Sequence, residues 1–109
     1  MKGVANRLHF LEVHMIERHV TFEVLSDKTD AFEHFFIHEY RPAMSHMAGF
    51  VRADLLRESE APQNYQMVLR FHSLDSAAAW RASAEHKALS PILKSYYSSS
   101  NLQVYQVIA

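Results

Sequence analysis

Cysteine is absent from the 109-residue sequence, and glycine occurs at only two positions, Gly3 and Gly49. Without cysteine the chain has no disulfide, iron–sulfur cluster, thiolate zinc site or cysteine nucleophile. With two isolated glycines it has no P-loop and no GxGxxG loop to hold phosphate groups. These shortages exclude the common nucleotide-binding and thiol-dependent classes of protein.

Long apolar runs and an excess of basic charge are also missing. No apolar stretch approaches the ~18–20 residues of a membrane span, so we expect no membrane partner. The formal net charge is −1, which provides no basic field for a phosphate backbone, and we expect no nucleic-acid partner. Residues 1–14 lack the apolar stretch and cleavage site of a secretory signal, so we predict a cytoplasmic protein.

What is present is the composition of a globular protein, with 49% hydrophobic and 21% charged residues. The length accommodates one domain. Regular patterning begins near Met15, so we predict a single domain over residues 15–109 and an N-terminal extension over residues 1–14. That extension is either frayed, the product of a misassigned start codon, or an added edge strand.

In the first half, residues 17–25 alternate, with Val20, Phe22 and Val24 on one face. A period of two predicts a strand with one buried face. Capping residues follow, and apolar residues then recur at helical spacing from Phe32 to Met47. Pro42 is expected to kink or restart this helix, and Gly49 to end it.

The second half predicts further elements of the same two kinds. In order they are a strand over residues 50–58, a polar turn over 59–64, a strand over 65–72, a helical region over 74–97 and a strand over 102–108. Tyr65 and Phe71 lie on one face of the middle strand. Pro91 is placed in the first turn of a new helical segment capped by Ser90. The polar run 98–101 is expected to break the pattern.

The order β-α-β-β-α-β predicts an α+β fold of the ferredoxin-like type. Right-handed crossovers place both helices on one face of a four-stranded antiparallel sheet. The last strand carries apolar residues on both faces, such as Leu102 and Tyr105. We therefore expect a homodimer formed through the sheet faces; alternatively, Tyr105 only shields its own hairpin.

Four stretches of the sequence carry a family resemblance: residues 42–50, 55–57, 65–73 and 79–86, the last ending in a Ser-x-x-His signature at Ser83 and His86. On these residues the chain resembles the antibiotic biosynthesis monooxygenase family of dimeric α+β barrels. The resemblance covers residues 15–109. It implies a homodimer with facing sheets, and a pocket in each protomer between the sheet and its own helices.

The resemblance also implies a chemistry: oxygenation without metal, flavin or haem, on polycyclic phenols, anthrones or quinols. The conjugate anions of such compounds donate an electron to dioxygen unaided. The protein then needs a dry aromatic slot, a base, and groups that stabilise the anion. No cofactor is expected.

Trp80 and His86 are the catalytic candidates. Trp80, the only tryptophan, is expected to share a helix face with the small residues Ala77 and Ala84, so that its ring forms a wall of the slot; alternatively it is only a core residue. His86 is expected to face inward as general base or anion-holding group, since imidazole titrates near neutral pH. It too has a core alternative.

Four further residues are candidates for substrate binding: Phe22, His38, Tyr40 and Tyr65. Tyr65 has the alternative of a tyrosine at the rim of the sheet. His34 and His38 stand four residues apart and could contact one metal ion, but no third ligand follows from the sequence, and no metal site is predicted. Arg52, Arg70 and His72 would serve the pocket if they face the helices and the dimer interface if they face away; Arg70 and His72 lie opposite the Tyr65–Phe71 face and are assigned to the interface.

The leading functional hypothesis is a cofactor-independent monooxygenase acting on an electron-rich aromatic molecule of the anthrone or quinol type. The alternatives are a non-catalytic dimer that binds an aromatic metabolite, and a cofactor-free isomerase or lyase on the same scaffold. Haem-degrading relatives, which share a tryptophan near Trp80, need an asparagine near Arg18 and a histidine near Ser90. Haem degradation is therefore disfavoured.

Overall fold

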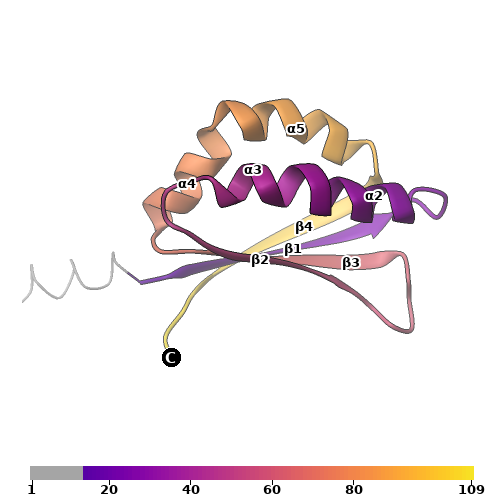
Figure 1. The fold of residues 1–109 in the computed structure, drawn as a ribbon. Coiled ribbons are helices and arrows are strands. Elements are labelled where there is room, and N and C mark those ends of the chain that lie inside the picture. The colour runs from indigo at the N-terminus through magenta and orange to yellow at the C-terminus, as the bar shows by residue number, and fades with distance from the viewer. Residues whose placement is uncertain (1–13) are drawn as a thin grey trace, which may run out of the picture.

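The computed structural model describes residues 14–109, in which both helical regions lie on one face of a four-stranded antiparallel sheet (Figure 1). The elements are β1 (Ile16–Val24), α2 (Thr29–Phe35), the π-helical η1 (Phe36–Tyr40), α3 (Arg41–Ser45), β2 (Phe50–Arg57), β3 (Asn64–Phe71), α4 (Leu74–Ala82), α5 (Ala84–Lys94) and β4 (Tyr97–Gln106). The predicted α+β fold is confirmed. The N-terminal extension was predicted over residues 1–14. Residues 1–13 of it lie outside the described residues.

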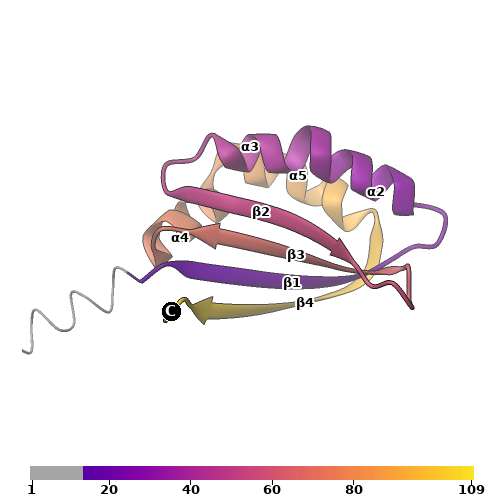
Figure 2. The same cartoon turned by 60° about the horizontal axis from the view of Figure 1, so that its bottom comes forward.

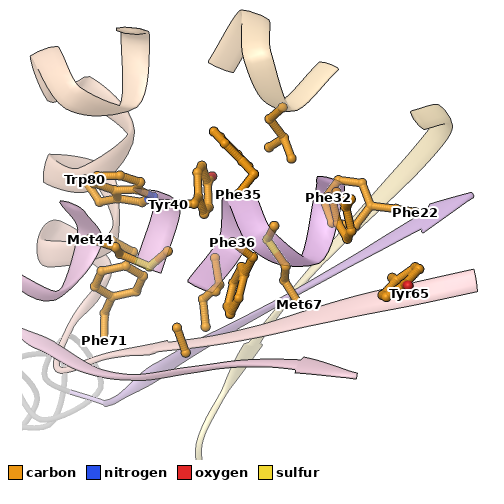
Figure 3. Packing of buried hydrophobic residues seen from close by; sticks show 14 of the residues in the cluster. Phe22, Phe32, Phe35, Phe36, Tyr40, Met44, Tyr65, Met67, Phe71 and Trp80 are labelled. Carbon is orange, nitrogen blue, oxygen red and sulfur yellow. The ribbon is translucent and has the colours of Figure 1, made fainter. Parts of the chain in front are cut away.

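The strands are ordered β2-β3-β1-β4, so β2 and β4 form the two edges of the sheet (Figure 2). The register pairs Val20 with Met67 and Phe22 with Tyr65. Directly paired residues share a face, and these side chains point toward the helices. Together with residues of α2–α3 and α4 they form one apolar core (Figure 3). The buried faces predicted for β1 and β3 are thereby confirmed.

The first helical region changes its hydrogen bonding just before Pro42. Residues 36–40 form a π-helical turn, in which the backbone N–H of Arg41 donates to the carbonyl of Phe36, and α3 then begins with Pro42 in its first turn. Proline has no N–H to donate to the carbonyl four residues earlier, so a restart here costs least. The predicted restart is confirmed. Because the π turn contains an extra residue, it brings Tyr40 to the buried side.

The second helical region breaks at Ser83, so the predicted boundary at Ser90 is wrong. Ser83 is in an extended conformation and serves as the N-cap of α5, its side chain accepting a hydrogen bond from the N–H of His86 at 3.1 Å. A serine hydroxyl that satisfies this free N–H favours a new helix start. Pro91 therefore lies inside α5, with its ring exposed.

The last strand begins at Tyr97, so the expected break over residues 98–101 is also wrong. Ser99 and Ser100 pair with Glu23 and Phe22 of β1. Short polar side chains are tolerated there because β4 is an exposed edge strand whose stability comes from backbone pairing. Of its apolar residues, Leu102 is 40% exposed and shares the helix side of the sheet with Val20.

The helix-free face of the sheet is more polar than we expected from β4. Glu17 lies on this face near the start of β1, where His19 Nε2 is 2.7 Å from one carboxylate oxygen and Arg70 Nε donates to the other at 2.8 Å. The contact with His19, and to a smaller extent that with Arg70, lowers the pKa of Glu17 below its usual value. The His19 ring also lies 4.6 Å from that of Tyr105. Arg70 is thus on the face predicted for it.

None of the helices within residues 14–109 is long and apolar enough to cross a membrane. The cytoplasmic location stays a prediction.

Gly49 is the position in this fold most sensitive to a single methyl group. Its φ is +85°, and a Cβ added there would lie 2.4 Å from the Cβ of Ser76, which the capping box of α4 holds in place. We expect Gly49→Ala to lower the free energy of unfolding by about 2 kcal/mol or more. Urea denaturation would measure this loss. Ala48→Gly, a change of similar size at the exposed preceding residue, should cost less than half as much.

Candidate active site

A cavity of about 210 Å³ lies between the sheet and the second helical region. It is lined by residues of six elements, β1, η1, β3, α4, α5 and β4: Arg18, Val20, Phe22, Tyr40, Met67, Leu69, Trp80, Arg81, His86, Ser90, Leu93, Tyr97 and Ser100. Four of the six predicted site residues, Phe22, Tyr40, Trp80 and His86, are among them. This cavity is the candidate active site.

Trp80 is both a core residue and a wall of this cavity. Its side chain is 1% exposed and packs edge-on against Tyr40, with ring centroids 5.5 Å apart (Figure 3). Ala77, one turn earlier in α4, is also buried. Ala84, which was expected to flank the indole from the same helix, belongs to α5 instead, because the helix is interrupted at Ser83.

His86 stands at the first turn of α5 and faces the indole. Its ring lies 5.2 Å from that of Trp80, at nearly a right angle, and 6.4 Å from that of Tyr40. Burial, and then the charges of Arg81, Arg18 and Lys94, lower the pKa of His86. The positive end of α5 acts in the same direction. His86 is therefore a neutral imidazole near neutral pH, the form that accepts a proton.

Tyr40 and Arg18 complete the polar part of the cavity. Burial raises the pKa of the Tyr40 phenol, against the opposing effects of the Trp80 side chain and the Arg18 guanidinium. The phenol therefore stays protonated and can donate a hydrogen bond. Sequence reasoning did not propose Arg18 as a site residue. The available signal was a lone arginine on the apolar face of β1, between Ile16 and Val20.

Tyr65 lies at the other end of the core, away from Trp80 and Tyr40 (Figure 3). Its hydroxyl donates a short hydrogen bond to Glu33 Oε2, which also accepts from Arg57 Nη1 at 3.1 Å. Burial and this bond to Glu33 raise the pKa of Tyr65. The three side chains line a separate groove between η1 and β2. The structure therefore does not bring Tyr65 to the cavity with His86.

His38 is also outside the cavity, because it lies on the exposed side of η1. Its ring stacks on that of His34, with centroids 4.2 Å apart. Within residues 14–109 no group of three or more histidine, aspartate or glutamate side chains is arranged to hold a metal ion. The histidine pair is thus a feature of the outer helix surface.

Tyr65→Phe distinguishes a structural role of this hydroxyl from a role in substrate binding. We expect the substitution to lower the free energy of unfolding by about 1.5 kcal/mol, because a hydrogen bond to a carboxylate is lost. Turnover and KM should change by less than about twofold, since the hydroxyl faces Glu33 and not the cavity. Steady-state kinetics and urea denaturation of the same preparation measure both. A large rise in KM with unchanged stability would restore Tyr65 to the site.

The profile of the antibiotic biosynthesis monooxygenases matches residues 15–91. The chain belongs to the antibiotic biosynthesis monooxygenase family. The match includes the strand-to-helix segment that carries Trp80 and the Ser83–His86 cap. The resemblance read from the sequence is thus confirmed.

Solved structures share the fold at low sequence identity. SnoaB, a cofactor-independent oxygenase from Streptomyces nogalater, is 20% identical with a TM-score of 0.79; the match covers 88% of this chain and 95% of SnoaB. A protein from Nitrosomonas europaea, proposed to be an antibiotic biosynthesis monooxygenase, is 20% identical over 87% of this chain and 91% of its own, with a TM-score of 0.79. No curated protein matches the sequence.

Within this family member, Arg18 and Ser90 both line the cavity. They are the two positions on which the sequence-based expectation against haem degradation depends. An arginine and a serine offer no imidazole or amide there. The expectation against haem degradation therefore depends on two residues of the candidate site, and it stays a prediction.

Proposed function

We propose that the protein is a cofactor-independent monooxygenase that oxidises an electron-rich aromatic compound of the quinol or anthrone type. The observation that carries this proposal is the cavity itself. It joins a neutral imidazole, a protonated phenol and two guanidinium groups to a wall that includes an indole. A base beside cationic groups in a partly buried pocket favours loss of a phenolic or benzylic proton and stabilises the resulting anion.

The chemistry balances without a further reductant. His86 takes a proton from the substrate, and the anion gives two electrons to dioxygen as a carbon–oxygen bond forms, which yields a hydroperoxide once a proton is returned. The hydroperoxide then loses water: the O–O bond breaks, the C–H electron pair becomes the second carbon–oxygen bond, and dioxygen has gained four electrons in all. One oxygen atom remains on the substrate, and the other leaves as water with two hydrogens. An anthrone methylene thus becomes a carbonyl, and a quinol becomes a hydroxyquinone. In this proposal Trp80 and Phe22 hold the ring, Tyr40 donates a hydrogen bond to a ring oxygen, and His86 carries the proton.

The size of the cavity favours the smaller substrates of this class. An engineered cavity of roughly 150 Å³ holds one benzene molecule, and the cavity here is about 210 Å³. A space of this volume accommodates one or two fused rings. We therefore place benzoquinols and naphthoquinols ahead of three-ring anthrones.

Oxygen uptake tests the proposal directly. Metal-stripped protein is added to quinols, anthrones and catechols in an oxygen-electrode cell, with a mass spectrum of each product. Uptake proportional to protein concentration, with one oxygen atom gained by the substrate, is the expected result. Binding of the same compounds without uptake would favour a metabolite-binding protein. Product formation under nitrogen would favour an isomerase or lyase.

We also propose that the protein is a homodimer whose helix-free sheet faces meet. Two features support this: the Glu17–His19–Arg70 cluster on that face, and the exposed Tyr105 of β4, which pairs with Glu17 and so shares that face. Paired, hydrogen-bonded charges are the kind that an interface tolerates. Light scattering after size exclusion should give twice the chain mass. A monomer at every concentration would contradict the proposal.

A further inference from the structure

The cavity carries positive charge without an acidic side chain to balance it. Arg18 and Arg81 are both in its lining, His86 is neutral, and no aspartate or glutamate of residues 14–109 lines it. Lys94 lies close enough to act on the pKa of His86. A site with two guanidinium groups and no carboxylate is complementary to an anion.

Of the two arginines, Arg18 is the one that is partly buried. It lies on the helix side of β1, where its direct neighbours across the sheet are Leu69 of β3 and Val104 of β4. The side chain is half-buried. Burial and the charge of Arg81 lower its pKa, but a guanidinium stays protonated in a protein. The fold thus keeps a charge among apolar neighbours.

Within the described part of the chain, Arg18 takes part in none of the four ion pairs. No side-chain hydrogen bond of residues 14–109 involves it either. Arg41, Arg52, Arg57 and Arg70 each have such a partner. A half-buried charge without a partner costs free energy. The position of Arg18 in the cavity wall therefore points to a ligand that supplies a negative charge to the guanidinium. Arg81 differs because it is exposed on α4, where water solvates it.

We propose that Arg18 binds a carboxylate carried by the aromatic substrate, and so selects acidic hydroxyaromatic compounds over neutral ones. The inference rests on the proposed function, since it assigns the substrate class of the same cavity. A guanidinium presents parallel N–H donors that match the two oxygens of a carboxylate. The carboxylate would stay ionised throughout, whereas the hydroxyl that reacts is served by neutral His86. Arg18 is here a specificity-determining residue.

A matched pair of two-ring probes tests the inference by binding alone. The probes are 6-hydroxy-2-naphthoate and 2-naphthol, which share the ring system and the phenol and differ only in the carboxylate. Dissociation constants are measured by titration calorimetry under nitrogen, so that no turnover occurs. We expect the carboxylate probe to bind about tenfold more tightly, as a charged hydrogen-bonded pair implies.

The variants then assign this preference to one side chain. Arg18→Gln should bring the two dissociation constants within about twofold of each other, and Arg18→Lys should retain part of the preference. Lys87→Gln removes the same charge from the exposed face of α5, next to His86 but outside the cavity lining, and should keep the full preference. Circular dichroism confirms that each variant is folded.

The possible outcomes separate this inference from the proposed function. Equal affinity for the two probes, a preference that survives Arg18→Gln, or an equal loss in Lys87→Gln would each overturn the carboxylate site. Oxidation of an acidic hydroxyaromatic compound with a kcat/KM that Arg18→Gln does not change would overturn it as well, and leave the oxygenase standing. A preference that depends on Arg18, together with no oxygen uptake, would keep the anion site and refute the oxygenase.

Discussion

Replacing His86 with alanine should lower turnover by about 10²–10⁴-fold, the range that a positioned general base contributes. The free energy of unfolding should fall by less than about 1 kcal/mol, because the imidazole is only half-buried and the cap on α5 uses the backbone N–H of this residue. Oxygen uptake and urea denaturation measure the two effects. His34→Ala, on the exposed face of α2, is the matched control and should change neither.

The pH dependence of the rate provides a second test of the same residue. The pKa of His86 is lowered, so the imidazole remains a neutral base to a pH below the ordinary value of 6.5. The rate is therefore expected to fall only as the pH drops through this lowered pKa, and the acid limb of kcat/KM should lie below pH 6.5. A limb above that value, or one that persists in His86→Ala, would assign the proton to another group. Parallel losses of turnover and stability would return His86 to the core.

Replacing Trp80 with alanine should have the largest effect on stability of any single change at the site. The indole is 1% exposed and fills the space between α4, η1 and α5. Its removal leaves a cavity, and we expect a loss of about 3–5 kcal/mol in the free energy of unfolding. Leu74→Ala, at the 60% exposed start of α4, should cost less than about 0.5 kcal/mol. Urea denaturation followed by circular dichroism compares the two.

Trp80→Phe distinguishes packing from a specific role of the indole. It keeps an aromatic wall, removes the N–H beside Tyr40, and should cost about 2 kcal/mol. If the ring serves only to hold the substrate, KM should rise while kcat changes by less than about threefold. Trp80 is the only tryptophan, so this variant has no tryptophan fluorescence with which to follow binding. Its dissociation constants are therefore measured by calorimetry. A drop in kcat with unchanged KM would instead indicate that the indole acts in the transition state.

The fold followed from the sequence wherever a local period repeats. The buried alternation of β1 and β3 was predicted, as was the restart of the first helix at Pro42. The boundaries at Ser83 and Tyr97 were missed for one shared reason. Serine is compatible with a cap, a helix and an edge strand, and only the neighbours decide among them. Ser83 became a cap because its hydroxyl meets the N–H of His86.

The candidate site was predicted in part. Trp80, His86, Tyr40 and Phe22 line one cavity, whereas Tyr65 and His38 do not. Tyr65 was placed on the correct face of β3, but its distance along the strand from the cavity depends on the register with β1. His38 lies outside the cavity because it is one turn beyond His34 on the exposed side of the helix, opposite the buried Phe32 and Phe36.

The sequence by itself determined the element order, the buried faces of the central strands and the family, because each depends on residues close together in the chain. The tertiary structure alone decided that Arg18, Tyr40, Trp80 and His86 share a cavity, and that Arg18 has no acidic partner there. Those residues come from β1, η1, α4 and α5, and their separations are fixed by the packing of helices on the sheet. No local period contains that information, since the balance of charge in a cavity is a property of elements brought together from across the chain.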